Sequence, residues 1–307
     1  MKLRTVAAGL AGTVGLAAVG NQVVARRTRP LQPALSGDAR TFRWRGMDVD
    51  YADIGDPTDP DLVLLHSIHA AASNWEFRPI AERLAEDYHV LAPDFPGFGR
   101  SDRPPLMYSG SLYTAFVADF IEAVADEPKC LASSLSAAYL AEAAERADVG
   151  PIVLICPTTT TTGVRQSMVR SAYRSPLVGT AIHNLVASRP ALEYFFREYA
   201  VLNPAVLGAD DLEYLWQTSH QPGAKYPVAS FVSGFLDRPT DLGETIAATG
   251  VEVTMVWGRH AALAPLSFGR RVAERGDARL VVVDGARMLP HLEHPDRVAA
   301  AIGPCLD

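Results

Sequence analysis

Lysine and cysteine are both scarce in this chain of 307 residues. It contains three lysines (Lys2, Lys129 and Lys225) and 25 arginines, the difference between 28 basic residues and those three. An acidic surface with few lysines fits a salty cytoplasm, but a GC-rich genome gives the same preference for arginine, so a halophilic source stays open. The three cysteines form no disulfide framework: two lie in apolar runs that predict strands and one lies near the C-terminus. We expect free, buried thiols.

Acidic residues are absent from the first 37 residues, which hold five basic ones. The other 270 residues hold 23 basic and 35 acidic side chains, a formal charge of 23 − 35 = −12. Phosphate backbones are bound by clustered Lys and Arg, so this acidic excess argues against nucleic acid as a partner.

The N-terminal segment Val6 to Ala25 reads VAAGLAGTVGLAAVGNQVVA. Twenty residues at helical rise span about 30 Å, roughly the hydrocarbon thickness of a bilayer. Arg26, Arg27 and Arg29 follow and are typical of a cytoplasmic flank. We therefore predict that residues 1–30 are a membrane anchor with its basic flank, the membrane being bound through residues 6–25 and the body lying in the cytoplasm. The alternative is export after signal cleavage, since AVG before Asn21 resembles a cleavage site.

After a linker, residues 31–42, strand and helix patterns alternate. Continuous apolar runs such as LVLLH (62–66) and VEVTMVWG (251–258) are typical of strands covered on both faces, and their alternation with helices predicts a mostly parallel sheet. Residues 43–157 plus 246–304 are the expected core. Residues 158–245 contain helical patterns rich in aromatics and no strong strand, which predicts a helical cap over the carboxyl ends of the strands, where open α/β sheets bind ligands.

The segment DFPGFGRSDRP, residues 94–104, is the most specific motif, with LLH before it and Trp75 between them. On these residues the chain resembles the α/β-hydrolase superfamily, especially its capped esterase, epoxide-hydrolase and dehalogenase-like branch, over roughly residues 43–304. The resemblance implies an α/β-hydrolase fold: a mostly parallel central sheet flanked by helices, with a helical cap inserted after the sixth strand. It also implies a hydrolase that uses no cofactor and no metal.

The resemblance places the nucleophile at Ser134, in the segment Ala132 to Ser136, where small residues replace both glycines of the G-x-S-x-G turn. Ser136 offers another register that lengthens the strand. The oxyanion donors are expected to be the backbone N–H groups of Leu135 and Ile68. Ser67 stands where relatives carry glycine, and a positive φ there is unfavourable for serine.

The acid and base positions carry no catalytic residue. Ala261 occupies the usual acid position after the strand ending in Trp257-Gly258, and the alternative site after the preceding strand holds only the threonines 158–162. Met288 occupies the base position, and methionine accepts no proton. His291, three residues on, is the candidate displaced base, with His260 a weaker candidate.

Three hypotheses follow. In the first, the chain is a catalytically impaired member that binds a small apolar molecule or ester under the cap. In the second, it is a weakly active serine hydrolase of the carboxylic-ester type, which uses Ser134 with a displaced base such as His291. In the third, it is a membrane-tethered scaffold for a protein partner. Whether the chain is an enzyme stays open, as do its ligand and oligomeric state. His66 and His69 lack a third partner for a metal site. The expected pocket residues are His66, Ser67, Ser133, Thr158, Thr159, His260 and Met288.

Overall fold

The computed structural model describes residue 15 and residues 17–306. That part of the chain is built on one eight-stranded sheet with the strand order β1-β2-β4-β3-β5-β6-β7-β8. β1, β2 and β4 pair antiparallel, and the strands from β3 to β8 run parallel to one another. The strands are β1 (Asp38–Trp44), β2 (Met47–Ile54), β3 (Asp61–Leu65), β4 (His89–Pro93), β5 (Lys129–Ser133), β6 (Ile152–Ile155), β7 (Val253–Gly258) and β8 (Arg279–Val283).

Helices cover both faces of this sheet because its central strands are apolar on both faces. Val63 and Leu65 of β3 belong to one hydrophobic cluster, with the helices α3, α4, α10 and α11. Leu62 and Leu64, which alternate with them, belong to a second cluster with α2 and α13. These helices are α2 (Arg78–Leu84), α3 (Gly110–Val124), α4 (Ser136–Ala143), α10 (Leu242–Thr249), α11 (Leu266–Gly276) and α13 (Pro295–Leu306).

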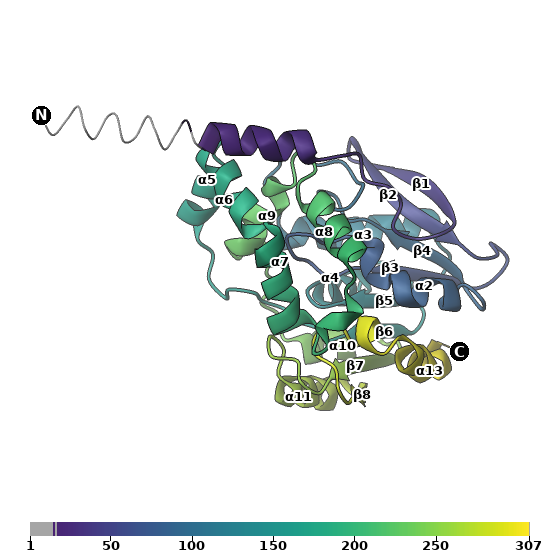
Figure 1. The fold of residues 1–307 in the computed structure, drawn as a ribbon. Coiled ribbons are helices and arrows are strands. Elements are labelled where there is room, and N and C mark those ends of the chain that lie inside the picture. The colour runs from purple at the N-terminus through teal and green to yellow at the C-terminus, as the bar shows by residue number, and fades with distance from the viewer. Residues whose placement is uncertain (1–14, 16, 307) are drawn as a thin grey trace, which may run out of the picture.

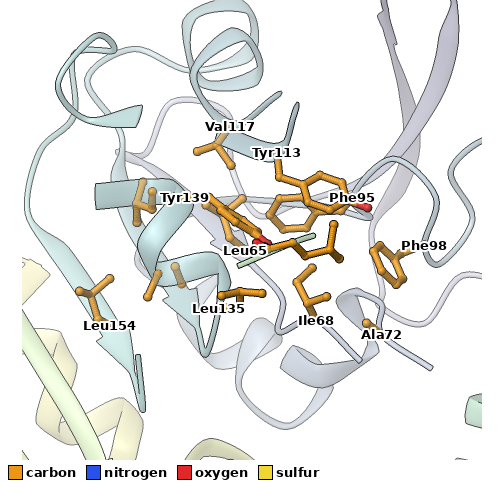
Figure 2. Close-up of a cluster of buried hydrophobic side chains, with 14 of the residues drawn as sticks. Leu65, Ile68, Ala72, Phe95, Phe98, Tyr113, Val117, Leu135, Tyr139 and Leu154 are labelled. Carbon is orange, nitrogen blue, oxygen red and sulfur yellow. The ribbon is translucent and has the colours of Figure 1, made fainter. Parts of the chain in front are cut away.

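An aromatic cluster fixes the helices that follow β4 and β5 (Figure 2). The Tyr113 ring of α3 lies 5.4 Å from the Phe95 ring and 5.5 Å from the Tyr139 ring of α4, measured between centroids. The side chains of Ile68 and Leu135 are buried in the same cluster. The loop after β3 and the start of α4 are therefore anchored to one rigid core.

The D-x-x-G-x-G motif closes a tight loop around a buried carboxylate. Asp94 accepts hydrogen bonds from the backbone N–H groups of Asn74 and Arg100, each 2.7 Å long. Gly99 has a φ of +49°, and a Cβ there would lie 1.9 Å from the Asp94 carboxyl carbon. Glycine is thus required by space as well as by conformation. The motif shapes the loop after β4 and joins it to the segment after β3.

The segment between β6 and β7 forms the cap, and Figure 1 shows its helices grouped to one side of the sheet. This insertion after the sixth strand is as expected. α10 crosses the expected cap boundary at residue 245 and packs on α4 and α11 of the core. The cap elements are α5 (Ser167–Arg174), α6 (Val178–Val186), α7 (Arg189–Phe195), η2 (Phe196–Ala200), η3 (Pro204–Val206), α8 (Ala209–Ser219) and α9 (Lys225–Val232).

The N-terminal residues 17–27 are helical and lie against the cap (Figure 1). Asn21 donates a 3.1 Å hydrogen bond to the Leu177 carbonyl and accepts one of 2.9 Å from Asn184. Residues 6–14 of the expected membrane anchor lie outside the described residues. Within the described ones, no helix combines the length and apolar character needed to cross a membrane.

A second boundary also differs from the expectation. β1 begins at Asp38, inside the segment 31–42 that the sequence predicts as a linker, and pairs with β2 from Asp38 opposite Asp53 to Trp44 opposite Met47. Its first residues are exposed and polar. The exposed first residues of this edge strand are stabilised by ladder hydrogen bonds and carry little hydrophobic signal, which is why the pattern predicts the strand from Phe42 rather than from Asp38.

We predict that Ser109→Ala destabilises the fold by about 1 kcal/mol, because the Ser109 hydroxyl caps α3 by accepting the Leu112 N–H at 3.2 Å. Ser109→Asn is the control and should retain most of the stability, since asparagine is an equally good cap. Urea unfolding of the three proteins tests this; equal midpoints for Ser109→Ala and the parent would show that the cap contributes nothing.

Candidate active site

An apolar cavity of about 430 Å³ lies between the cap and the carboxyl ends of the strands. Because β3, β5, β6, β7 and β8 run parallel, the loops that follow them meet at one edge of the sheet, and each contributes residues to this cavity. The cap covers it with α7, η2 and α9. The lining residues are Ser67, Ile68, His69, Ser134, Thr158, Thr160, Thr161, Thr162, Phe195, Tyr199, Ala200, Phe231, Val232, Leu263, Met288 and Leu289.

Ser134 occupies the sharp turn between β5 and α4. Its φ is +55°, a left-handed conformation that costs a non-glycine residue about 1 to 3 kcal/mol. Two backbone hydrogen bonds hold the turn: the Ser134 N–H donates to the Ile155 carbonyl at 2.9 Å, and the Ser134 carbonyl accepts from the Thr158 N–H at 3.1 Å. Ser136 is the first residue of α4, and its hydroxyl donates to the His66 carbonyl. The strained turn thus presents Ser134, rather than Ser136, to the cavity.

Two backbone donors flank this serine. Within the described residues, no group accepts a hydrogen bond from the N–H of Leu135 or from that of Ile68. Both side chains are buried in the aromatic cluster, which fixes the peptide groups that carry these donors (Figure 2). Two unpaired N–H groups beside a serine hydroxyl can bind a carbonyl oxygen.

The proton acceptor that a nucleophilic serine needs is absent from the described contacts of Ser134. Its hydroxyl has one hydrogen-bond partner in that part of the chain, the Thr158 hydroxyl at 3.4 Å. Met288 lines the same cavity, and the buried Ala261 follows β7. A threonine hydroxyl and a thioether are both too weakly basic to take the proton.

His291 lies beneath the turn rather than in the cavity. It is fully buried, and its Nε2 lies 3.1 Å from Oε1 of Glu76, a residue of the short helix η1 (Asn74–Phe77). Its ring packs against that of Phe77, with centroids 5.7 Å apart. His291 is the second residue of the short helix α12 (Pro290–Glu293), and its side chain is buried in the core. It is absent from the residues that line the cavity with Ser134.

Glu76 is the charged centre of this buried group. Burial raises the pKa of its carboxyl, but the contacts with His291, Ser133 and Ser67 outweigh burial and lower the pKa to about 2. The carboxylate is therefore ionised at neutral pH. Glu76 belongs to a segment whose sequence, NWEF, gives no sign of burial, and sequence reasoning missed it.

Ser67 is fixed on three sides. Its N–H donates to Glu76 Oε2 at 2.8 Å and its hydroxyl donates to the same oxygen. Its carbonyl lies 2.7 Å from Nδ1 of His66. The φ of Ser67 is not positive, so Ser67 avoids the left-handed backbone conformation that is unfavourable for serine. Glu76 thus sets the orientation of the loop that carries the Ile68 N–H.

His69 is a further polar group in the cavity that the sequence did not single out as a pocket residue. Its Nδ1 accepts the Ala71 N–H at 3.2 Å, and burial lowers the pKa of its ring to about 4. At neutral pH the ring is uncharged, so the proton is on Nε2. Within the described residues, the one hydrogen bond of the His69 ring is that of Nδ1, so Nε2 has no partner there. His69 therefore adds a third hydrogen-bond donor to the cavity.

Four of the expected pocket residues lie outside the cavity lining, and each has a structural reason. His66 is fully buried, with Nδ1 beside the Ser67 carbonyl and Nε2 accepting the Phe95 N–H at 3.0 Å. Ser133 is buried next to Glu76. The Thr159 carbonyl accepts the Arg238 N–H, and the exposed His260 lies on the solvent side of the loop after β7. Ser67, Thr158 and Met288 do line the cavity, with Ser134.

The threonine loop after β6 is held by an acid from the far end of the cap. Asp237 is buried and accepts hydrogen bonds from the N–H and hydroxyl of Thr161 and from the N–H groups of Thr162 and Gly163. The next residue, Arg238, forms a bidentate ion pair with Glu142 of α4. The cap is thereby joined to the core beside the cavity. The cap residues Phe195, Tyr199 and Phe231 line the cavity. They could not be assigned to it from the sequence, because the direction in which their side chains point depends on how the cap packs on the core.

Comparisons with known proteins agree with this geometry. Residues 62–301 match the model of the alpha/beta hydrolase family. Over 59 residues the chain is 36% identical to an uncharacterized hydrolase of Saccharomyces cerevisiae, a match that covers 19% of this chain and 20% of that protein. The chain thus spans about a fifth of the length of this curated relative.

Three solved structures illustrate the likeness. A serine hydrolase involved in carbazole degradation has a TM-score of 0.70 at 18% identity, covering 88% of this chain and 99% of that one. A bacterial membrane phospholipase A has a TM-score of 0.72 at 20% identity, covering 99% and 95%. The carboxylesterase CesB of Bacillus subtilis has a TM-score of 0.67 at 17% identity, covering 94% and 98%. At these identities the likeness establishes the fold, and the α/β-hydrolase fold predicted from the sequence is confirmed.

We predict that Glu76→Gln lowers the free energy of unfolding by about 3 kcal/mol at pH 7, because it removes the charge that His291, Ser133 and Ser67 face in the core. The folded-state pKa of about 2 lies below the ordinary 4.5. The stabilisation is therefore complete above pH 4.5 and is lost as the pH falls from 4.5 toward 2. Denaturant unfolding of the parent and the variant across this range measures the difference.

Glu82→Gln, an exposed change on α2, is the matched control and should alter stability by less than about 0.5 kcal/mol. A difference between the parent and Glu76→Gln that stayed constant from pH 7 to pH 3 would contradict a low folded-state pKa for Glu76.

Proposed function

This chain belongs to the alpha/beta hydrolase family, and from that premise we propose that it binds a small apolar molecule with a carbonyl oxygen beneath its cap and turns over esters at Ser134 poorly or not at all. The observation that carries the proposal is the contrast between two halves of the site. Apolar walls and unpaired N–H donors support the binding half, whereas in the described part of the chain the Ser134 hydroxyl contacts no base that could serve the proton-transfer half.

The lack of a general base affects the rate of ester hydrolysis more than the preserved, strained turn at Ser134 does. A serine without a general base keeps only the part of the rate enhancement that comes from binding and oxyanion contacts, about 10³ to 10⁴ over the uncatalysed reaction. Met288 and Ala261 replace base and acid together, so neither member of the usual proton path remains. The Thr158 hydroxyl at 3.4 Å supplies no substitute.

The ligand class follows from the cavity's donors and walls. Ile68 and His69 of the lining offer N–H groups, and Leu135, the residue after Ser134, offers a third. The aromatic and aliphatic side chains of the cap and of the loop after β8 offer no charge. Near neutral pH the His69 ring is uncharged, since its pKa is about 4. The site therefore favours a neutral ketone, ester or amide oxygen on an apolar body over a free cation. A volume of about 430 Å³ lies in the range of small-molecule sites.

The second hypothesis, a weakly active serine hydrolase with His291 as base, is less well supported. The described contacts of His291 are with Glu76 and the Phe77 ring, and none joins it to Ser134. Buried without a place in the cavity lining, it would have to leave Glu76 to reach the serine hydroxyl. That movement would leave an ionised carboxylate in the core without its partner.

We predict that the parent and Ser134→Ala hydrolyse p-nitrophenyl butyrate at the same rate, because the described contacts of the Ser134 hydroxyl include no base that could remove its proton. Fluorophosphonate labelling followed by mass spectrometry should leave Ser134 unmodified in both low and high salt. A rate that collapses in Ser134→Ala would contradict the proposal and favour the second hypothesis. In that case His291→Gln should remove the same activity.

We further predict that the parent binds 4-phenyl-2-butanone and that His69→Leu weakens this binding by about 2- to 10-fold, the usual value of one neutral hydrogen bond. Binding is measured by calorimetry, and butylbenzene, which has no oxygen, is the control ligand. His69→Leu should not weaken the binding of butylbenzene. His260→Leu, an exposed change outside the cavity, is the control variant. Failure of the parent to bind the ketone would contradict this ligand class.

A further inference from the structure

Exposed apolar side chains gather on one part of the molecule. Of the fourteen large hydrophobic residues that are exposed in the described part of the chain, nine lie on the N-terminal helix 17–27, on α5 with the residues just before it, and on α6. We call these three elements the cap face; Figure 1 shows them together at one end of the cap. The nine are Val19, Val23, Val164, Met168, Val169, Val178, Ile182, Leu185 and Val186.

The arrangement on α6 is that of an amphipathic helix. Its four exposed residues are spaced at i, i+4, i+7 and i+8, which places them on one side. The opposite side is fixed in the cap by the buried His183, whose Nδ1 lies 2.9 Å from the Tyr173 hydroxyl and whose Nε2 lies 2.7 Å from the Ser219 carbonyl. The exposed apolar side therefore has no partner within the described chain. Leu185 is 72% exposed there, and Met168 of α5 is 88% exposed.

The charge of the same elements departs from that of the whole chain. Residues 1–37 contain five basic residues and no acid, and residues 149–192, which include α5 and α6, contain four arginines and no acid. The rest of the chain then holds 28 − 9 = 19 basic and 35 acidic residues, a charge of −16. The two acid-free segments are more than a hundred residues apart in sequence, yet Asn21 and Asn184 bring them into contact.

From this combination we propose that the cap face docks on the surface of an anionic lipid bilayer, with its exposed apolar side chains entering the interface and its arginines meeting the lipid phosphates. Basic groups next to an anionic leaflet each favour binding, and an apolar helix side adds hydrophobic burial. Residues 6–14, which precede this face in the chain, are mainly apolar.

The charge of the cap face also favours a lipid surface over a second copy of the chain or a protein as its binding partner. In a symmetric dimer the same patch would face itself, so arginines would meet arginines, because the three cap-face elements contain no acid of their own. A protein partner, as in a membrane-tethered scaffold, would have to bring its own acidic and apolar surface. An anionic bilayer offers both properties together.

The test is flotation of the full chain with phosphatidylcholine vesicles, with and without phosphatidylglycerol, at low and high salt. The parent should bind the anionic vesicles and lose affinity as salt screens the charges. Met168→Gln/Leu185→Gln and Arg26→Glu/Arg27→Glu should each bind on the order of tenfold more weakly. Both pairs are exposed, so thermal unfolding should match the parent.

Matched controls change exposed residues away from the cap face and outside the cavity lining. Leu202→Gln and Arg146→Glu/Arg270→Glu replace the same kinds of side chain and should bind like the parent. Equal binding by the cap-face variants would overturn the proposal and assign any binding to residues 1–14, which all variants retain. Equal binding of neutral vesicles, or a solution dimer that Met168→Gln/Leu185→Gln dissociates, would overturn it as well.

Discussion

The ionised carboxylate of Glu76, buried beneath the serine turn, is the interaction on which the site's shape depends. It holds the Ser67 N–H and hydroxyl after β3, lies beside Ser133 at the end of β5, and faces His291 after β8. Three loops from separate strands therefore share one charge. An unpaired buried carboxylate costs several kcal/mol, so the partners must stay in place together. Their common position fixes the two backbone donors that flank Ser134.

This constraint explains how the site keeps its form although the described contacts of the Ser134 hydroxyl include no proton acceptor stronger than the Thr158 hydroxyl. In relatives, a glycine allows the loop after β3 to point its donor at the reacting oxygen, as the resemblance implies. Here Ser67 reaches a stable loop conformation without positive φ, because its own polar groups bind Glu76 and His66. The strain at Ser134 persists because β5, β6 and α4 determine that turn independently of any catalytic partner.

The sequence predicted well those features that depend on local pattern. The strands of the parallel sheet, the Asp94 loop and the insertion after β6 follow from apolar runs and glycine positions, which act over a few residues. The roles of Glu76 and His69 were not predicted, because the burial of a polar residue depends on residues far along the chain. Glu76, for example, contacts His291, which lies 291 − 76 = 215 positions later. The aromatic cap residues that line the cavity were not predicted for the same reason, since helical spacing alone does not say which side of a helix faces the cavity.

The cavity and the cap face lie on different helices of the same region, and the two proposals have a joint physical consequence. α7, η2 and α9 line the cavity, while α5 and α6 carry the exposed apolar residues. An apolar molecule with one carbonyl oxygen partitions into a bilayer far more than into water, so a binding protein is most effective where that molecule is concentrated. Docking through the cap would place the cavity near this supply. Tight retention then rests on the N–H donors, because the apolar walls alone would give the ligand little advantage over the bilayer.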